Sequence, residues 1–148
     1  MATVTTRKVG TGVRGMPTRQ MDYWETTIDC ATTNITSADV VQLFSVPANT
    51  FIHQVGMVVD TAEGGTLTID VGITGGDTDG FLDGVNGNAA AGTGVSTAAS
   101  GGSSGYQNGY YSVAADTVDA IWNNDADAAI LRFWMLTSDV SDAGSDKI

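Results

Sequence analysis

The residues best suited to nucleophilic chemistry in this sequence are its single cysteine, Cys30, and its single histidine, His53. A nucleophile–base pair would have to join these two, or His53 and a serine. Cys30 and Ile28 are two residues apart in a segment where outward and inward positions alternate, and His53 alternates in the same phase as Phe51 and Val55. Both positions are typical of packed strand residues. No G-x-S-x-G elbow, H-E-x-x-H pair, phosphate loop or dinucleotide fingerprint occurs. The sequence therefore predicts no enzyme, no catalytic residue and no cofactor, with a hydrolase that uses two aspartates as the remaining catalytic alternative.

The densest acidic motif is the segment 75–84, which reads GGDTDGFLDG. Its carboxylates, Asp77, Asp79 and Asp83, are oxygen ligands of the kind that Ca²⁺ prefers. The spacing departs from an EF-hand because Phe81 stands at a ligand position and no Glu closes the loop. The alternative is a turn in which the Asp side chains bond their own backbone and Phe81 enters the core. The sequence favours the turn.

Four aromatic residues near the C-terminal half could bind a sugar, because pyranose faces stack on aromatic rings. These are Tyr106, Tyr110, Tyr111 and Trp122. The same residues, together with Trp134, are equally suited to be core residues or anchors of a subunit interface. The sequence leaves these alternatives open.

Charge separates the first residues from the rest of the chain. Residues 1–19 contain four basic and no acidic residues: Arg7, Lys8, Arg14 and Arg19. This segment has a net charge of +4 and the remainder −15, within a total of −11. An acidic body repels nucleic acid and anionic membranes, so neither is expected as a partner. The basic residues predict an extended arm over residues 1–22 that is either unstructured or ordered on a neighbouring surface.

The length and composition predict one all-β domain. A chain of 148 residues can bury one core, and its 19 glycines, two prolines and many Thr and Val residues favour short strands. One cysteine excludes an internal disulfide framework, and no apolar run is long enough for a signal peptide or a membrane span. We expect a domain over residues 23–140, made in the cytosol, and a flexible C-terminal tail over residues 141–148.

Alternating apolar residues predict seven or eight strands from Tyr23 onward. In the segment 51–60 one face is expected to carry Phe51, His53, Val55, Met57 and Val59. In the segment 66–74 the buried face is expected to carry Leu67, Ile69, Val71 and Ile73. The intervening Glu63-Gly64-Gly65 predicts a hairpin. Further strands are expected at 40–46, 110–113, 118–122 and 128–137.

The last of these segments is apolar on both faces, which predicts a central strand covered by the core and by a neighbouring subunit or loop. By contrast, 15 of the 20 residues in 86–105 are Gly, Ala or Ser, which predicts a long loop without a strand. This loop is expected either to lie on the surface or to allow close approach at a symmetry axis. The whole pattern predicts an antiparallel β-sandwich, with a jelly roll as the first choice.

The run VVQLFSVPANTFIHQVGMVVDTAEGGTLTIDVG, followed by GGDTDGFLDG, resembles the capsid decoration or cement proteins of tailed phages. The resemblance covers roughly residues 24–85. It implies a jelly-roll-type fold, commonly a trimer, that sits where capsomers meet and clamps the shell. It also implies the major capsid protein as partner, a place on the outside of the virion, and synthesis in the host cytoplasm. No short motif of the family carries site residues over to this chain.

Together these observations predict a viral structural protein that decorates and stabilises a phage capsid as a homo-oligomer. Its basic arm is expected to tether it to the major capsid protein or to a neighbouring trimer. The alternative is a fibre-associated domain that binds a receptor or a glycan through its aromatic residues.

Overall fold

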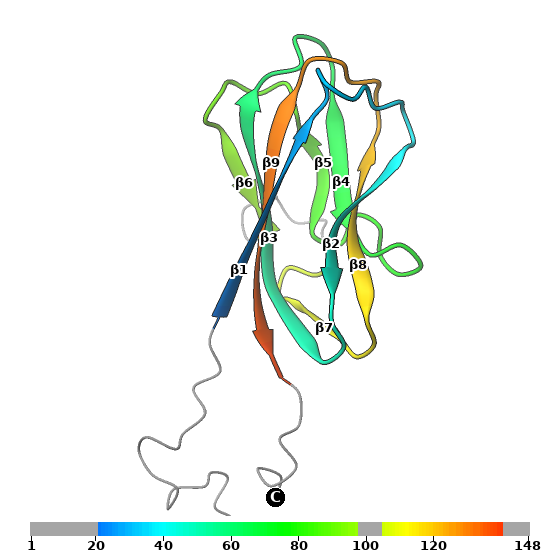
Figure 1. Ribbon diagram of the computed structural model, residues 1–148, viewed down its shortest axis with the longest axis vertical. Helices are drawn as coiled ribbons and strands as arrows, with labels where there is room; N and C mark the ends of the chain where they lie inside the picture. Colours follow the sequence, from blue (N-terminus) through cyan, green and yellow to red (C-terminus); the bar gives the residue numbers. More distant parts are fainter. Residues whose placement is uncertain (1–20, 98–104, 141–148) are drawn as a thin grey trace, which may run out of the picture.

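The computed structural model describes residues 21–97 and 105–140, and the structural findings below concern these residues. They form nine strands (Figure 1): β1 (Met21–Asp29), β2 (Val40–Val46), β3 (Thr50–Thr61), β4 (Thr68–Gly72), β5 (Leu82–Asn86), β6 (Gly94–Ser96), β7 (Tyr110–Ser112), β8 (Asp116–Trp122) and β9 (Ile130–Asp139). The described ranges contain no α-helix, and therefore no helix that is long and apolar enough to cross a membrane. The predicted all-β class is confirmed.

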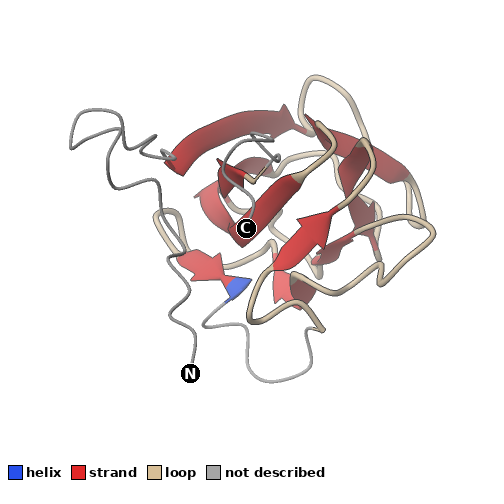
Figure 2. Cartoon of the chain, turned by 90° about the horizontal axis from the view of Figure 1, so that it is seen from below, coloured by secondary structure: helices blue, strands red, loops and turns tan. Residues whose placement is uncertain are grey.

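The strands form two antiparallel sheets packed face to face (Figures 1 and 2). One sheet has the order β1-β9-β3-β6, and β7 pairs with β3 beside β6. The other has the order β2-β8-β4-β5. The chain changes sheet at every connection except those from β4 to β5 and from β6 to β7. β6 and β7 share one edge of their sheet, because both pair with β3. When they are counted as one position, the chain alternates between the sheets as in a jelly roll, which confirms the predicted sandwich.

The connection after β3 differs from the predicted hairpin. β3 and β4 belong to different sheets, so the segment 63–65 carries the chain across the sandwich. The Glu63 carboxylate accepts hydrogen bonds from the backbone N–H groups of Asp127, Ala128 and Ala129 at 2.9, 3.1 and 2.7 Å. These bonds tie the crossing to the segment that leads into β9. The hairpin prediction is wrong because an alternating pattern gives the face of a strand but not its sheet.

β3 also changes face partway along its length. Its register against β9 shifts between Ile52 and Gln54, which marks a β-bulge at His53. Ile52 and Val55 are fully buried, whereas Phe51 and His53 lie on the outer face with their ring centroids 4.8 Å apart. The single face predicted for Phe51 to Val59 is therefore wrong, because one extra residue inverts the alternation.

The small-residue segment 86–105 is not one continuous loop. β6 lies within it and pairs with Gly56, Met57 and Val58 of β3. The buried Thr97 hydroxyl donates to the Val55 carbonyl at 3.0 Å and accepts from the Val55 N–H at 3.1 Å. The prediction of no strand is wrong here because small residues carry no alternation signal. Residues 98–104 lie outside the described part of the chain.

The core fills the space between the two sheets. The predicted buried face of the β4 region is confirmed, since Leu67, Ile69, Val71 and Ile73 are all buried. Trp122 of β8 packs on Phe133 of β9 across the sandwich, with ring centroids 6.0 Å apart. Burying side chains of this size contributes about 1.5–3 kcal/mol each.

β9 is the predicted central strand. It pairs with β1 along one side and with β3 along the other. Its buried side chains are those of Leu131, Phe133, Met135 and Thr137, and the residues between them are partly exposed on the outer face. One of these, Trp134, lies across Gly56 of β3, where an added Cβ would overlap the indole ring. The glycine therefore leaves the space that the indole occupies.

Replacing this glycine tests the outer-face packing. Gly56→Ala should lower the free energy of unfolding by about 1–3 kcal/mol, because the new methyl group forces Trp134 out of its position. Urea denaturation measures the loss. In a Trp134→Ala background the same substitution should cost clearly less. An equal cost in both backgrounds would contradict the contact.

Candidate functional site

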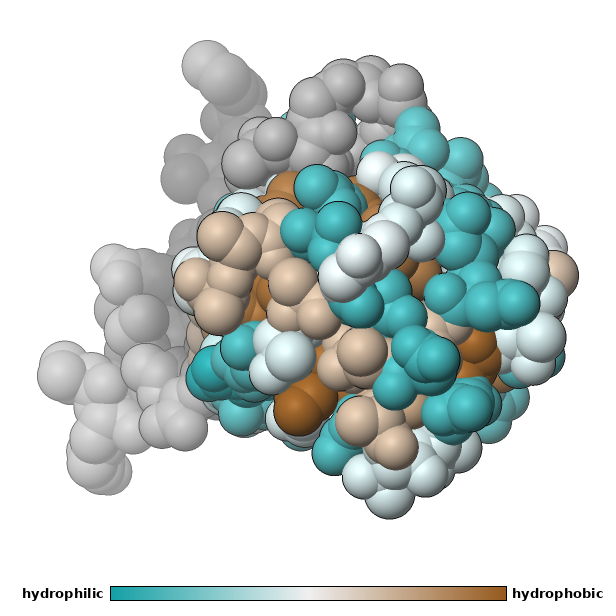
Figure 3. All heavy atoms as spheres, turned by 90° about the horizontal axis from the view of Figure 1, so that it is seen from above, coloured by the Kyte–Doolittle hydropathy of each residue, from teal (hydrophilic) through white to brown (hydrophobic). Residues whose placement is uncertain are grey.

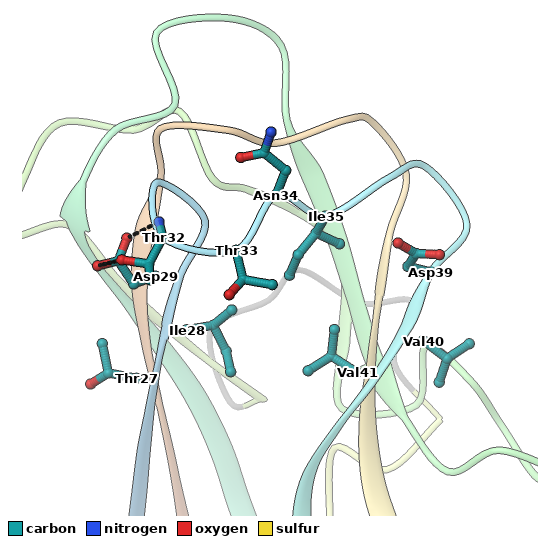
Figure 4. Close-up of a pocket in the computed structure, with 10 residues that line it drawn as sticks. All are labelled: Thr27, Ile28, Asp29, Thr32, Thr33, Asn34, Ile35, Asp39, Val40 and Val41. Atoms are coloured by element: carbon teal, nitrogen blue, oxygen red, sulfur yellow. Dashed lines mark hydrogen bonds between the residues drawn. The ribbon is translucent and has the colours of Figure 1, made fainter.

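A cleft opens where β1 and β2, each an edge strand of its sheet, face each other. It has a volume of about 580 Å³. Ile28 of β1, Val41 of β2, and Thr33 and Ile35 from the loop between them point toward one another into this space (Figure 4). Asp29 and Asp39 flank it on opposite sides (Figure 4). The cleft thus has an apolar floor between two carboxylates.

The loop from β1 to β2 is fixed by its own polar groups. The Asp29 carboxylate accepts hydrogen bonds from the N–H groups of Ala31 and Thr32 at 2.9 and 3.2 Å and from the Thr32 hydroxyl at 3.0 Å. At the other end, the Asp39 carboxylate accepts from the Thr36 N–H at 2.9 Å. Each carboxylate thus holds one wall in place and adds negative charge beside the cleft. Figure 3 views this end of the sandwich and shows hydrophobic side chains among hydrophilic ones.

A second candidate surface is the outer face of the five-stranded sheet. Tyr23 of β1 pairs with Leu136 of β9, and Phe51 of β3 pairs with Tyr111 of β7, so these side chains share one face with Trp134. Tyr23 and Tyr111 are 60% and 43% exposed. An apolar and aromatic surface of this kind has the composition of a subunit interface.

Polar pairs interrupt this outer face. The Arg132 guanidinium donates to both oxygens of the Asp60 carboxylate, at 2.6 and 3.2 Å, and this hydrogen bonding holds the pKa of Asp60 below its ordinary value. His53 Nε2 lies 2.7 Å from Ser138 Oγ. Since both pairs are at least partly open to solvent, each contributes little to stability.

The structure separates the aromatic residues singled out from the sequence. Trp122 has no exposed surface and belongs to the core, so the interpretation of it as a surface anchor or sugar platform is wrong. Tyr106 and Tyr110 pack against each other with ring centroids 4.5 Å apart, and both rings contact Phe81. The Tyr106 ring also covers Gly80, where a Cβ would overlap it. Tyr111 and Trp134 remain available on the outer face.

The two residues best suited to nucleophilic catalysis do not meet. The Cys30 backbone N–H donates to Ala129, whereas His53 contacts Ser138, nine residues further along the same stretch of chain. That separation corresponds to roughly 30 Å of extended strand. Cys30 is fully buried, and burial raises the pKa of its thiol. The structure therefore provides no Cys–His pair.

The acidic segment 75–84 forms a turn between β4 and β5. The Asp77 carbonyl accepts from the N–H groups of Ile73 and Gly80 at 2.9 and 3.3 Å, and Phe81 is fully buried. A side-chain hydrogen bond that the protonated Asp79 carboxyl donates to Asp77, together with burial and nearby negative charge, raises the pKa of Asp79. Within the described ranges, no three His, Cys, Asp or Glu side chains gather to hold a metal ion. The turn and the buried Phe81 agree with the sequence prediction, and the hydrogen bonds that close the turn are accepted by the Asp77 backbone carbonyl.

The contact between Asp77 and Asp79 predicts a pH-dependent effect on the free energy of unfolding. A raised pKa means that the folded state binds the proton more tightly, so Asp79 opposes folding once the pH exceeds its unfolded pKa. Asp79→Asn keeps a polar partner for Asp77 and removes the repulsion. It should raise the free energy of unfolding by a few tenths of a kcal/mol at pH 7 and have no effect at pH 3. A loss of stability at pH 7 in urea denaturation would contradict the carboxyl–carboxylate contact.

The basic residues Arg7, Lys8, Arg14 and Arg19 lie outside the described residues, as does the predicted tail at 141–148. What the structure does place is their point of attachment. β1 begins at Met21, and its pairing brings Met21 opposite Ser138 of β9. The start of β1 and the end of β9 therefore lie side by side, at the end of the sandwich opposite the cleft (Figure 1).

Comparison with known proteins identifies similar structures. A chain of the acid-stable capsid of Helicobacter pylori bacteriophage KHP30 matches with a TM-score of 0.60 and 13% identity, over 82% of this chain and 89% of that one. A chain of the cyanophage Pam1 capsid matches with a TM-score of 0.57 and 16% identity, over 82% and 84%. A chain of the Ralstonia phage GP4 capsid matches with a TM-score of 0.52 and 20% identity, over 85% and 87%.

These similarities are similarities of fold. This chain has a jelly-roll sandwich that is also found in chains of phage capsids, as the sequence resemblance implied for the fold. No family model matches the chain, and no curated protein matches it in sequence.

Proposed function

We propose that this protein is a non-catalytic virion component that decorates the outside of a phage capsid and stabilises the shell. The observation that carries the proposal is the fold shared with three phage capsid chains over more than four-fifths of each chain. Because the matches cover nearly all of both partners, each matched chain is itself a small domain of comparable length. A small domain of this kind fits an accessory role on a larger shell.

The charge distribution supports a role in surface attachment. The segment 1–19 has a net charge of +4 and the rest of the chain −15. The basic arm is attracted to acidic protein surfaces and repelled by basic ones. We propose that the arm tethers the domain to the major capsid protein or to a neighbouring trimer.

The outer face of the five-stranded sheet supports self-assembly. Tyr23, Trp134 and Leu136 give it an aromatic and aliphatic character, and Trp134 is half-buried rather than fully covered. A closed trimer has head-to-tail contacts, in which each copy contributes two different patches, and this face is proposed as one of them. The proposed state is a homotrimer.

The alternative of a fibre-associated, glycan-binding domain is less well supported. It relied most on Trp122, which is fully buried, and on Tyr106 and Tyr110, which pack on Phe81. No platform of three adjacent exposed rings remains among the described aromatic residues singled out for it.

Co-sedimentation with purified phage heads that lack the protein tests the proposal. Wild-type protein should pellet with the heads. A variant with Arg7, Lys8, Arg14 and Arg19 all changed to Ala should bind about tenfold or more weakly at low salt, and the difference should shrink as salt screens the charges. Lys147→Ala, which removes a positive charge outside the arm, is the matched control and should bind like the wild type.

Both variants should keep the near-ultraviolet circular dichroism of the wild type, and the solution mass of each variant shows whether its oligomeric state is kept. Wild-type protein that ignores heads at every salt concentration would overturn the proposed function. A loss of binding that does not depend on salt would instead assign the tether to packing and not to charge.

A further inference from the structure

We infer that the cleft between β1 and β2 is the binding site for the basic N-terminal segment, residues 1–20, of a second copy of this chain. The inference rests on the self-assembly proposed above, and it specifies the surface that the arm occupies. Four features carry it: the open strand edges, the charge of β1, the chemistry of the cleft, and the reach of the segment.

Both strands that border the cleft have an unpaired edge within the described chain. β1 pairs only with β9, and β2 pairs only with β8. The nine residues of β1 therefore present backbone N–H and C=O groups along one side with no strand beside them. Such an edge is a template for an added extended segment.

The charge of β1 selects the kind of segment that can pair there. Its side chains include Asp22, Glu25 and Asp29 and no cation. Two copies of β1 placed edge to edge would bring these carboxylates together, which is unfavourable. A basic segment without acids would gain from the same charges. In this chain only residues 1–20 contain several cations and no acid.

The cleft itself matches the side chains of that segment. Its apolar floor of Ile28, Ile35 and Val41 lies between Asp29 and Asp39. In the N-terminal segment Val9 follows Lys8, and Val13 precedes Arg14. In an extended chain Arg7, Val9 and Val13 share one face, so the two valines can lie on the floor while Arg7 reaches a flanking carboxylate.

The position of Met21 favours binding of the segment to the cleft of a second copy over binding to the cleft of its own chain. The cleft is lined by Thr27, Ile28 and Asp29 at the end of β1, whereas Met21 is at its start, at the other end of the sandwich (Figure 1). The nine residues between these ends span roughly 30 Å, and 20 extended residues reach roughly 65–70 Å. To fill its own cleft the segment would have to reverse direction at Met21. Continuing outward, it has ample length to reach a neighbour.

Disulfide trapping between differently labelled full-length chains tests the inference. One chain carries Val9→Cys or Val13→Cys, and the other carries an affinity tag and Thr33→Cys, which points into the cleft. Thr74→Cys is the matched control, because Thr74 is also an exposed threonine and does not line the cleft. The native Cys30 should stay silent, since it is fully buried.

After mild oxidation of the protein alone, at least one arm position should form about tenfold more hybrid dimer with Thr33→Cys than with Thr74→Cys. Adding Asp39→Asn, which keeps an acceptor for the Thr36 N–H, should lower that yield at low salt. Equal yields at Thr33 and Thr74, or no hybrid dimer at all, would overturn the cleft as the site.

A chain carrying both Val13→Cys and Thr33→Cys tests whether the segment binds the cleft of its own chain or the cleft of another copy. Cross-linked species larger than one chain support exchange between copies, whereas a disulfide that closes only within single chains would overturn it. Unchanged near-ultraviolet circular dichroism in each variant shows that the fold is kept. Because no heads are present, failure here with intact binding to heads would reject the inference and leave the proposed function standing.

Discussion

The long antiparallel pairing of β3 with β9 is the interaction on which the rest of the molecule depends. It runs from Thr50 opposite Asp139 to Thr61 opposite Ile130. β1 attaches only to β9, and β6 and β7 attach only to β3, so the five-stranded sheet cannot form without it. The same two strands supply Val55, Met57, Leu131 and other buried residues to the core. With one cysteine in the chain, this packing is what holds the sandwich together.

This arrangement determines where function can reside. The centre of the sandwich is filled by side chains such as Trp122 and Phe133. The surfaces left over are strand edges, the outer face of a sheet and the acidic loops. Such surfaces suit assembly with other proteins, which agrees with a fold shared with phage capsid chains and with an acidic body joined to a basic arm.

The sequence was informative where a strand keeps a regular alternation, and silent where tertiary contacts decide. Ile69 and Val71 were predicted correctly as core residues because β4 alternates without interruption. His53 was placed on the wrong face because the bulge beside it leaves no mark in the hydrophobic pattern. β6 was missed because Gly94 and Ser96 carry no apolar signal, and its pairing depends on the β3 backbone. Trp122 was ambiguous because an aromatic residue serves equally well in a core and in an interface.

The candidate site shows the same division. The excess of basic residues in the arm was visible in the sequence, but its target was not. Ile28 and Val41 come together only because β1 and β2 are the edges of two different sheets on the same side of the sandwich. No spacing along the chain encodes that meeting, since it follows from the strand order of the jelly roll.

Decoration of the capsid is tested by an electron cryomicroscopy difference map between phage heads that contain this protein and heads that lack it. If the protein decorates the capsid, extra density appears on the outer surface, repeated at regular positions of the shell, and the two-sheet sandwich fits into it. Density confined to the tail or its fibres, or no ordered density on the head, would contradict a role in capsid decoration.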